Sequence, residues 1–211
     1  MATEWTFIWG KDGLGLEVIT DKKRAIFEST LVLIKEKGFH GTPMSQIAKN
    51  AGVAAGTIYH HFENKDTLIL ELYIYIRDKM LEALLQNDDE AMAYKDRFFN
   101  FWISHCLFYI KNPNALFFME LFVNSPYSSL DPVEENERFQ NTFRDLIKTG
   151  VETGVLKPLN HLILSALIHG SIVNAAKMNL CRRINIGEAE LQQIVEVIWD
   201  GMHQAPAAKA N

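Results

Sequence analysis

The residues of this sequence best suited to chemistry with a partner form a short row of hydrogen-bond donors. Thr57, Tyr59, His60 and His61 lie within five positions of one another, and Lys65 follows four residues later. Such side chains donate to phosphate oxygens and to base edges. The seven histidines and two cysteines show neither His-x-x-x-His nor Cys-x-x-Cys spacing, and no nucleophile elbow, P-loop or paired-carboxylate signature is present. We therefore expect a nucleic-acid-binding protein that is not an enzyme and needs neither metal nor cofactor.

Two short helices joined by a tight turn are needed to hold these donors on one surface. Thr42 has the hydroxyl that an N-cap requires, so we expect it to cap the first helix. Gly52 can adopt the positive φ of a sharp reversal. A second helix over residues 54–61 would turn Ile58 inward and leave the donors outside. This arrangement is typical of a helix-turn-helix, whose second helix enters a DNA major groove.

The same stretch resembles the DNA-binding domain of the TetR family of bacterial transcriptional regulators, and the resemblance covers residues 20–70. The residues that match keep the family's order and spacing: Thr42, Met44, Ile47, Ala48, Ala51, Gly52, Val53, Gly56, Thr57, Ile58, Tyr59, His61, Phe62 and Lys65. The resemblance implies that Thr42, Tyr59 and Lys65 contact DNA phosphates. The neighbouring donors are expected to reach base edges or adjacent phosphates: Thr57, His60 and His61. The alternative for Tyr59 and His61 is partial burial within the module.

The sequence departs from the family's pattern at the start of the second helix. Ala54 and Ala55 stand where the family commonly has serine and then a polar or basic residue. The helix therefore lacks a hydroxyl cap, which contributes about 1 kcal/mol. The two methyl groups can instead contact a thymine methyl in the major groove, so we include both alanines among the DNA-binding residues.

The charge distribution supports contact with phosphate at one end of the chain. The formal net charge of the 211 residues is −5. Residues 20–65 nevertheless carry seven basic residues against four acidic ones, whereas residues 66–211 have a net charge of −6. A basic front end on an acidic body is typical of a protein that touches DNA through one small module.

Helical periodicity continues to the end of the chain without strand alternation, which predicts an all-α fold of about nine helices. An arm, residues 1–19, precedes the helix-turn-helix DNA-binding domain of residues 20–66. Residues 67–204 would form a helical effector-binding and dimerisation body, and residues 205–211 a tail. The expected helices cover 20–37, 43–51, 54–61, 65–85, 90–111, 113–124, 131–153, 158–183 and 187–203.

Aromatic residues crowd the helices expected over 90–111 and 113–124. An ordinary core is the simple explanation for such a stripe. The rings also bracket polar groups, and the body of TetR-family proteins usually holds an effector, so a pocket is the functional alternative. The candidate effector-binding residues are Trp102, His105, Phe108, Tyr109, Phe118, Glu120, Phe122, His169 and Asn174.

The last two helices have the character of a dimer interface. Small residues alternate with large apolar ones in the first, and the second has an apolar stripe. Two such helices from each chain can close a four-helix bundle, which is the family's usual dimer mode, although intramolecular packing alone is the alternative. The candidate interface residues are Ala166, Leu167, Gly170, Ser171, Val173, Ile194 and Ile198.

Together these features predict a cytoplasmic, ligand-responsive transcriptional regulator, and the resemblance favours a repressor. Its expected partners are a double-stranded DNA operator, a small, largely apolar or aromatic effector, and a second copy of itself. The uncharged run over 158–176 holds too many polar groups for a membrane span, and no signal peptide is visible. Two alternatives are an architectural or cell-division-linked DNA-binding protein without an effector, and a helical enzyme using His105 or His169 as a base.

Overall fold

The computed structural model describes residues 20–86, 88–130 and 137–204, so the predicted arm and tail lie outside the described residues. Within these ranges the chain forms nine α-helices, one short 3₁₀ helix and no strand beyond an isolated bridge between Leu156 and His203. The elements are α1 (Asp21–Lys37), α2 (Met44–Asn50), α3 (Ala55–His61), α4 (Lys65–Leu85), α5 (Tyr94–Lys111), α6 (Pro113–Val123), η1 (Pro126–Leu130), α7 (Glu137–Glu152), α8 (His161–Leu180) and α9 (Glu188–Met202). The predicted all-α fold is confirmed.

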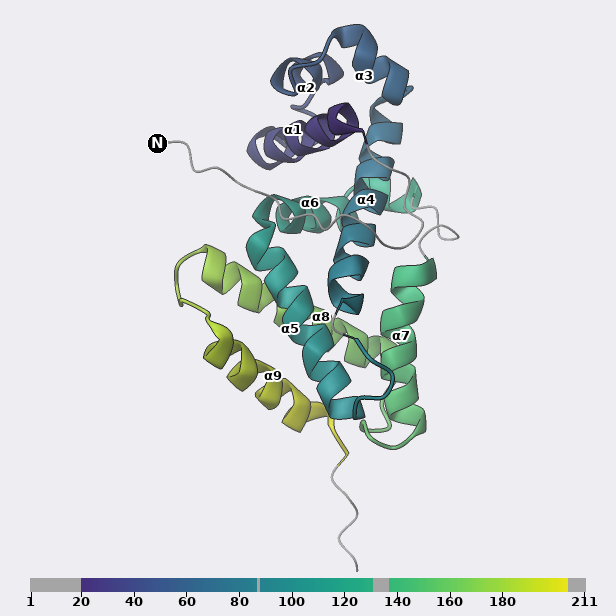
Figure 1. The fold of residues 1–211 in the computed structure, drawn as a ribbon, viewed down its shortest axis with the longest axis vertical. Helices are drawn as coiled ribbons and strands as arrows, with labels where there is room; N and C mark the ends of the chain where they lie inside the picture. Colours follow the sequence, from purple (N-terminus) through teal and green to yellow (C-terminus); the bar gives the residue numbers. More distant parts are fainter. Residues whose placement is uncertain (1–19, 87, 131–136, 205–211) are drawn as a thin grey trace, which may run out of the picture.

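The helices form a small upper module and a larger lower body, joined by α4 (Figure 1). Helices α1, α2 and α3 make the module around buried Phe27, Ile47, Ile58 and Phe62. Helix α1 also packs on α6 of the body, where the ring of Phe39 lies 6.0 Å from that of Phe118. The two parts therefore share one continuous apolar core.

Capping explains where several helices begin. Thr20 Oγ1 accepts a hydrogen bond from Lys23 N at 3.3 Å, and Asn64 Oδ1 accepts one from Thr67 N at 2.9 Å. The prediction that Thr42 caps α2 is wrong, because the N-cap is Pro43 and has no side-chain cap. The buried hydroxyl of Thr42 instead donates to the carbonyl of Gly38 at 2.8 Å, within the turn that follows α1.

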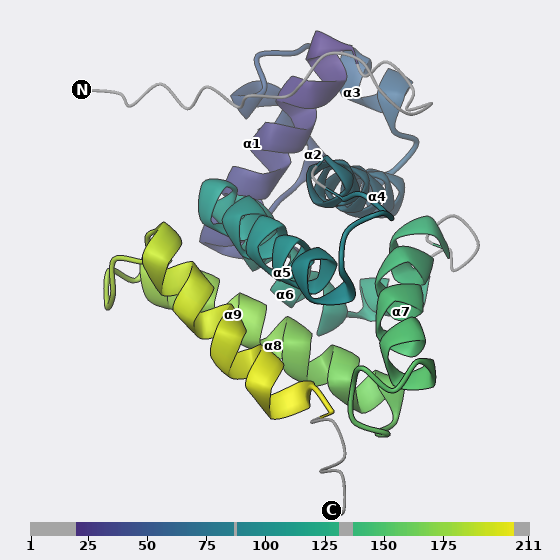
Figure 2. The ribbon, with the colours of Figure 1, turned by 60° about the horizontal axis from the view of Figure 1, so that its bottom comes forward.

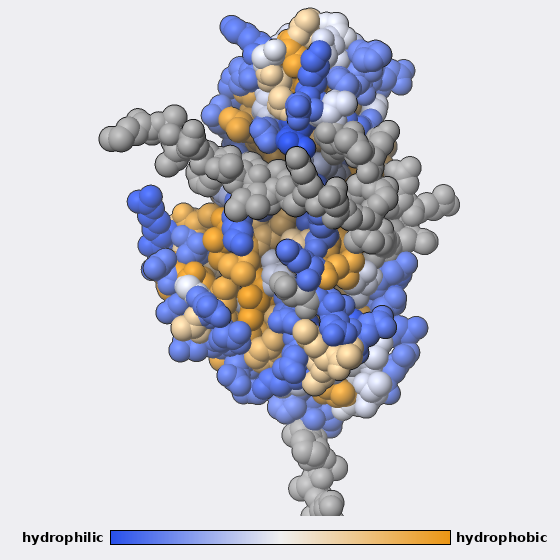
Figure 3. Space-filling view, viewed as in Figure 1, coloured by the Kyte–Doolittle hydropathy of each residue, from blue (hydrophilic) through white to orange (hydrophobic). Residues whose placement is uncertain are grey.

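Helix α5 is the centre of the body, in contact with α4, α8 and α9 (Figure 2). The indole of Trp102 donates to Ser171 Oγ at 2.9 Å and so fixes α5 against α8. Apolar side chains also gather over the upper half of α5 on the face shown in Figure 3. Helices α5 and α8 begin later than expected, at Tyr94 and His161, and η1 was not predicted.

No helix among the described residues combines the length and the apolar character needed to cross a lipid bilayer.

Candidate nucleic-acid interface and effector site

The outer surface of α3 presents the side chains best placed to meet DNA. Ile58 is fully buried and anchors the helix to the module. Tyr59, the next residue, faces outward with 57% of its surface exposed. Ala54, Ala55 and His60 are exposed as well. One buried residue thus holds a surface of two methyl groups, a phenol and an imidazole at the end of the molecule furthest from α9 (Figure 1).

Two further predicted donors lie at the edges of this surface. Thr57 and His61 are each half-buried. The His61 ring lies 5.7 Å from that of His60 and 6.1 Å from that of Phe62, so it bridges the exposed surface and the core. Partial burial, the alternative considered for His61, therefore describes its position.

Thr42 and Lys65 make polar contacts within the module. Thr42 is fully buried. The half-buried ammonium of Lys65 donates to the main-chain carbonyl of Phe39, which ties the start of α4 to the turn after α1. Burial lowers the pKa of Lys65, and the neighbouring carboxylate of Asp66 opposes that shift. Of the three phosphate contacts that the resemblance implies, only Tyr59 presents its side chain freely.

The candidate effector residues fall into an inner cluster of rings and several outlying residues. His105 is buried, 4.9 Å from the ring of Tyr109 and 5.8 Å from that of His169. Burial lowers the pKa of His105 to about 3, so its imidazole is neutral at physiological pH. Burial likewise raises the pKa of Tyr109, and the carboxylate of Glu120 adds to the shift. This cluster can offer neutral hydrogen-bonding groups inside an aromatic shell.

The remaining candidates serve other contacts. Glu120 forms an ion pair with Lys177 at 2.5 Å, joining α6 to α8. Phe118 packs against Phe39 of the module, and Phe122 lies 5.9 Å from Phe118. Trp102 and Phe108 are buried in α5, whereas Asn174 is exposed and donates to the carbonyl of Gly170 at 2.9 Å.

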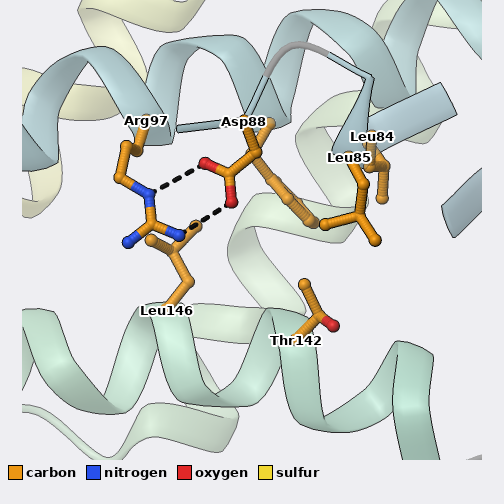
Figure 4. A pocket seen from close by; sticks show the side chains of 7 residues that line it. Leu84, Leu85, Asp88, Arg97, Thr142 and Leu146 are labelled. Atoms are coloured by element: carbon orange, nitrogen blue, oxygen red, sulfur yellow. Dashed lines mark hydrogen bonds and ion pairs between the residues drawn. The ribbon is translucent and has the colours of Figure 1, made fainter. Parts of the chain in front are cut away.

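A crevice that the sequence did not predict lies between α4, α5 and α7 (Figure 4). Its mouth carries an ion pair in which Arg97 Nε and Nη2 donate to the two carboxylate oxygens of Asp88 at 2.8 and 2.7 Å. The remaining lining residues are Leu84, Leu85, Phe101, Thr142 and Leu146. The sequence gives one signal for this crevice, the opposite charges of Asp88 and Arg97. The two residues are nine positions apart on either side of a helix break, so the sequence alone does not predict that they form an ion pair.

The outer face of α8 is apolar near its start, whereas α9 exposes Val197 among the polar side chains of Gln192, Gln193, Glu196 and Asp200. Leu167 and Val197 are 58% and 71% exposed, with Leu162 and Ile163 also exposed on α8. Among the predicted interface residues, Ala166 is exposed and Gly170 is half-exposed. Val173, Ile194 and Ile198 are half-buried, packed against the core, and Ser171 is turned inward to Trp102. The prediction missed Val197 because it lies out of phase with the stripe that α9 buries.

Among the described residues, no three His, Cys, Asp or Glu side chains gather where they could hold a metal ion.

Comparison with known proteins identifies the family. The family model for bacterial regulatory proteins of the tetR family matches residues 26–72, which contain the helix-turn-helix. A tetracyclin repressor-like C-terminal domain model matches residues 93–203, more than half of the chain. The chain belongs to the TetR family. This confirms the predicted resemblance, and with it a DNA-binding transcriptional regulator that is not an enzyme.

Relatives and solved structures agree with this TetR-family membership. An uncharacterized HTH-type transcriptional regulator from Haemophilus influenzae is 29% identical over 182 residues, covering 85% of this chain and 95% of the relative. A TetR-family regulator from Marinobacter aquaeolei has a TM-score of 0.81 at 21% identity, covering 88% of this chain and 97% of its own. FadR from Bacillus subtilis, solved with stearoyl-CoA, has a TM-score of 0.69 at 21% identity, covering 85% and 99%.

Proposed function

We propose that this TetR-family protein is a ligand-responsive repressor that binds a pseudo-palindromic operator as a homodimer and is released by a small, largely apolar or aromatic effector. The observation that carries the proposal is the outer surface of α3, where Tyr59, His60 and the methyl groups of Ala54 and Ala55 stand on buried Ile58. A helix that presents short and polar side chains in this way fits the major groove.

The exposed apolar residues of α8, together with Val197 of α9, support a homodimer. Leu167 of α8 and Val197 of α9 are the kind of large, exposed apolar side chains that a two-fold interface buries on both subunits. Such a dimer would place two copies of α3 about one turn of DNA apart, roughly 34–36 Å, as a pseudo-palindromic operator requires.

The body supports control by a ligand. It has an aromatic interior with neutral polar groups at His105 and Tyr109, and FadR, solved with stearoyl-CoA, is a protein of this fold that holds a ligand with a long acyl chain. An effector that prefers a body with wider-spaced copies of α3 would release the operator. Moving the dimer from 1:99 to 99:1 needs a differential affinity of about 5.5 kcal/mol.

Selection of genomic fragments by the purified protein at moderate salt tests the proposal, because salt suppresses non-specific binding. We expect one inverted repeat near a promoter. Tyr59→Ala should lose its recovery, Val197→Lys should lose it together with the dimer, and Lys111→Gln, on the surface of the body, should retain it. Diffuse recovery without a motif would instead favour an architectural DNA-binding protein.

A further inference from the structure

The crevice between α4, α5 and α7 has apolar walls. Leu84, Leu85, Phe101 and Leu146 supply them, and Figure 4 shows Leu146 and Thr142 on α7 opposite the ion pair. Its free volume of about 20 Å³ holds about one water molecule. Organic ligands occupy pockets of about 300 Å³ or more, so the structure shows this crevice closed.

The ion pair at the mouth has the geometry of a carboxylate receptor. Arg97 makes two parallel hydrogen bonds to Asp88, and the two side chains are 28% and 24% exposed. The guanidinium also holds the pKa of the Asp88 carboxyl below its ordinary value, so the pair is ionised at neutral pH. A planar fork of this kind donates two parallel hydrogen bonds to a carboxylate, so a carboxylate from solvent can bind it in competition with Asp88.

We propose that this crevice is the effector site, and that the effector is an amphiphilic carboxylate whose head replaces Asp88 on Arg97 while its apolar tail enters between α4 and α7. The proposal rests on the proposed ligand-responsive function and names the class of its effector. The exchange conserves both hydrogen bonds and the ionic attraction, and tail burial adds the hydrophobic gain. An uncharged head cannot replace the carboxylate, and Arg97 repels a cationic one.

The packing around the crevice gives the tail a path inward. Helix α7 packs more extensively on α8 than on α4, so a tail that enters between α4 and α7 displaces the smaller contact, while Tyr94 Oη of α5 still donates to the carbonyl of Leu146 at 2.8 Å. Phe101 stacks on Phe143 of α7 with 4.7 Å between ring centroids, and it meets His105 edge-on at 5.9 Å. Separation of the Phe101–Phe143 stack would therefore join the crevice to the aromatic cluster around His105.

The same exchange can act on DNA binding. Helix α4 begins at Lys65, immediately after the helix-turn-helix, and Asp88 follows its C-terminal end. The Asp88–Arg97 pair therefore ties that end of α4 to α5. A ligand that displaces Asp88 releases the tie, and a change in the tilt of α4 would alter the separation of two α3 helices in a dimer.

Calorimetry on the full-length protein with three ten-carbon probes, each below its solubility limit or micellar concentration, tests the proposal directly. We expect decanoate to bind at least tenfold more tightly than decanol, and decylammonium to bind most weakly. Equal affinities for the three probes, or no binding of decanoate, would overturn the proposal. This comparison uses only the wild-type protein and so does not depend on the folding of any variant.

Substitutions at the mouth locate the effect. Arg97→Gln should abolish the preference for decanoate over decanol, and Asp88→Asn should tighten decanoate binding several-fold because it removes the competing charge. Lys95→Gln is the matched control, since Lys95 lies on the same helix but pairs with Glu196 of α9 at 3.6 Å. A decanoate preference that survives Arg97→Gln would show that the head binds elsewhere.

Fragment selection by the ligand-free protein separates this inference from the proposed function. If the protein recovers an operator but decanoate shows no preference, only the effector class is wrong. If no operator is recovered, the repressor proposal fails, whereas the calorimetric comparison involves no DNA and still decides whether the crevice is a carboxylate site.

Discussion

The candidate sites of the DNA module and of the body differ in how far apart in the sequence their residues lie. The surface of α3 depends on a few neighbouring positions, with Ile58 and Phe62 buried beneath exposed Tyr59. The crevice of the body needs residues from α4, α5 and α7, which the chain supplies over more than sixty positions. Local signals therefore specify the first site, whereas only tertiary packing creates the second. Substitutions should affect the module locally and the body through its shared interior.

The largest expected effect on stability comes from removing the aromatic ring of Phe62 from the core of the module. Phe62 is fully buried, 5.5 Å from the ring of Phe27, so Phe62→Ala should lower the free energy of unfolding by about 3–5 kcal/mol. Urea denaturation measures the loss, with exposed Val123→Ala as the control. Hydrogen exchange should accelerate chiefly in α2 and α3, and equal acceleration in α8 would contradict the local character of the module.

The corresponding test of the body uses its buried imidazole. Because burial lowers the folded-state pKa of His105 to about 3, the unfolded chain binds the proton more readily between that pH and the ordinary value of 6.5. Stability is therefore lost as pH falls through this window, by up to about 1.4 kcal/mol per pH unit from this residue. The groups facing it include His169 and Tyr109.

His105→Gln should reduce that slope relative to wild type, since glutamine does not titrate. Denaturation midpoints at pH 7, 6, 5 and 4 for the two proteins measure the difference. If stability depends on pH in the same way in the two proteins, the folded body does not hold His105 neutral. The body would then not differ from the module in this respect.

The sequence predicted features that depend on neighbouring residues and missed those that depend on tertiary packing. The burial of Ile58 was predictable because it depends on the spacing of residues within two helical turns. The position of Lys65 was not, because its ammonium bonds to the Phe39 carbonyl, 26 residues earlier. The module and the all-α class were therefore accessible from periodicity and the family resemblance.

The crevice was inaccessible from the sequence for a physical reason. Aromatic residues bracket polar groups in the sequence of α5 and α6, but periodicity cannot distinguish a ring that fills the core from one that lines a site. Phe101 lines the crevice and Phe118 packs on the module, although both belong to the same aromatic run. Which role each ring takes depends on where α7 and α1 lie against it.

A smaller effect is expected at Thr42, which was predicted to cap α2 and instead donates within the turn after α1. Thr42→Val removes the hydroxyl that donates to Gly38 O at 2.8 Å while keeping the shape of the side chain. We expect a loss of about 1 kcal/mol in stability and little change in operator affinity, because the hydroxyl is buried. Thr42→Ser is the control that keeps the bond. A large loss of DNA affinity at unchanged stability would instead restore Thr42 as a phosphate contact.

The smallest expected effect sharpens the comparison by improving the module. Ala54 is the N-cap of α3, with an extended backbone at φ −65° and ψ 148° and no side-chain cap. Ala54→Ser places a hydroxyl where it can accept from a free N–H of the first turn, so we expect a gain of about 0.5–1 kcal/mol. The melting temperature of the variant measures the gain, and Ala55→Ser, one residue beyond the cap, is the matched control. Equal gains in both variants would mean that capping is not the cause.

The same variant also tests base recognition. If Ala54→Ser raises stability but weakens binding to an operator with thymine at the contacted position, the methyl group of Ala54 contacts that base. Base recognition would then explain why α3 of this chain has no hydroxyl cap.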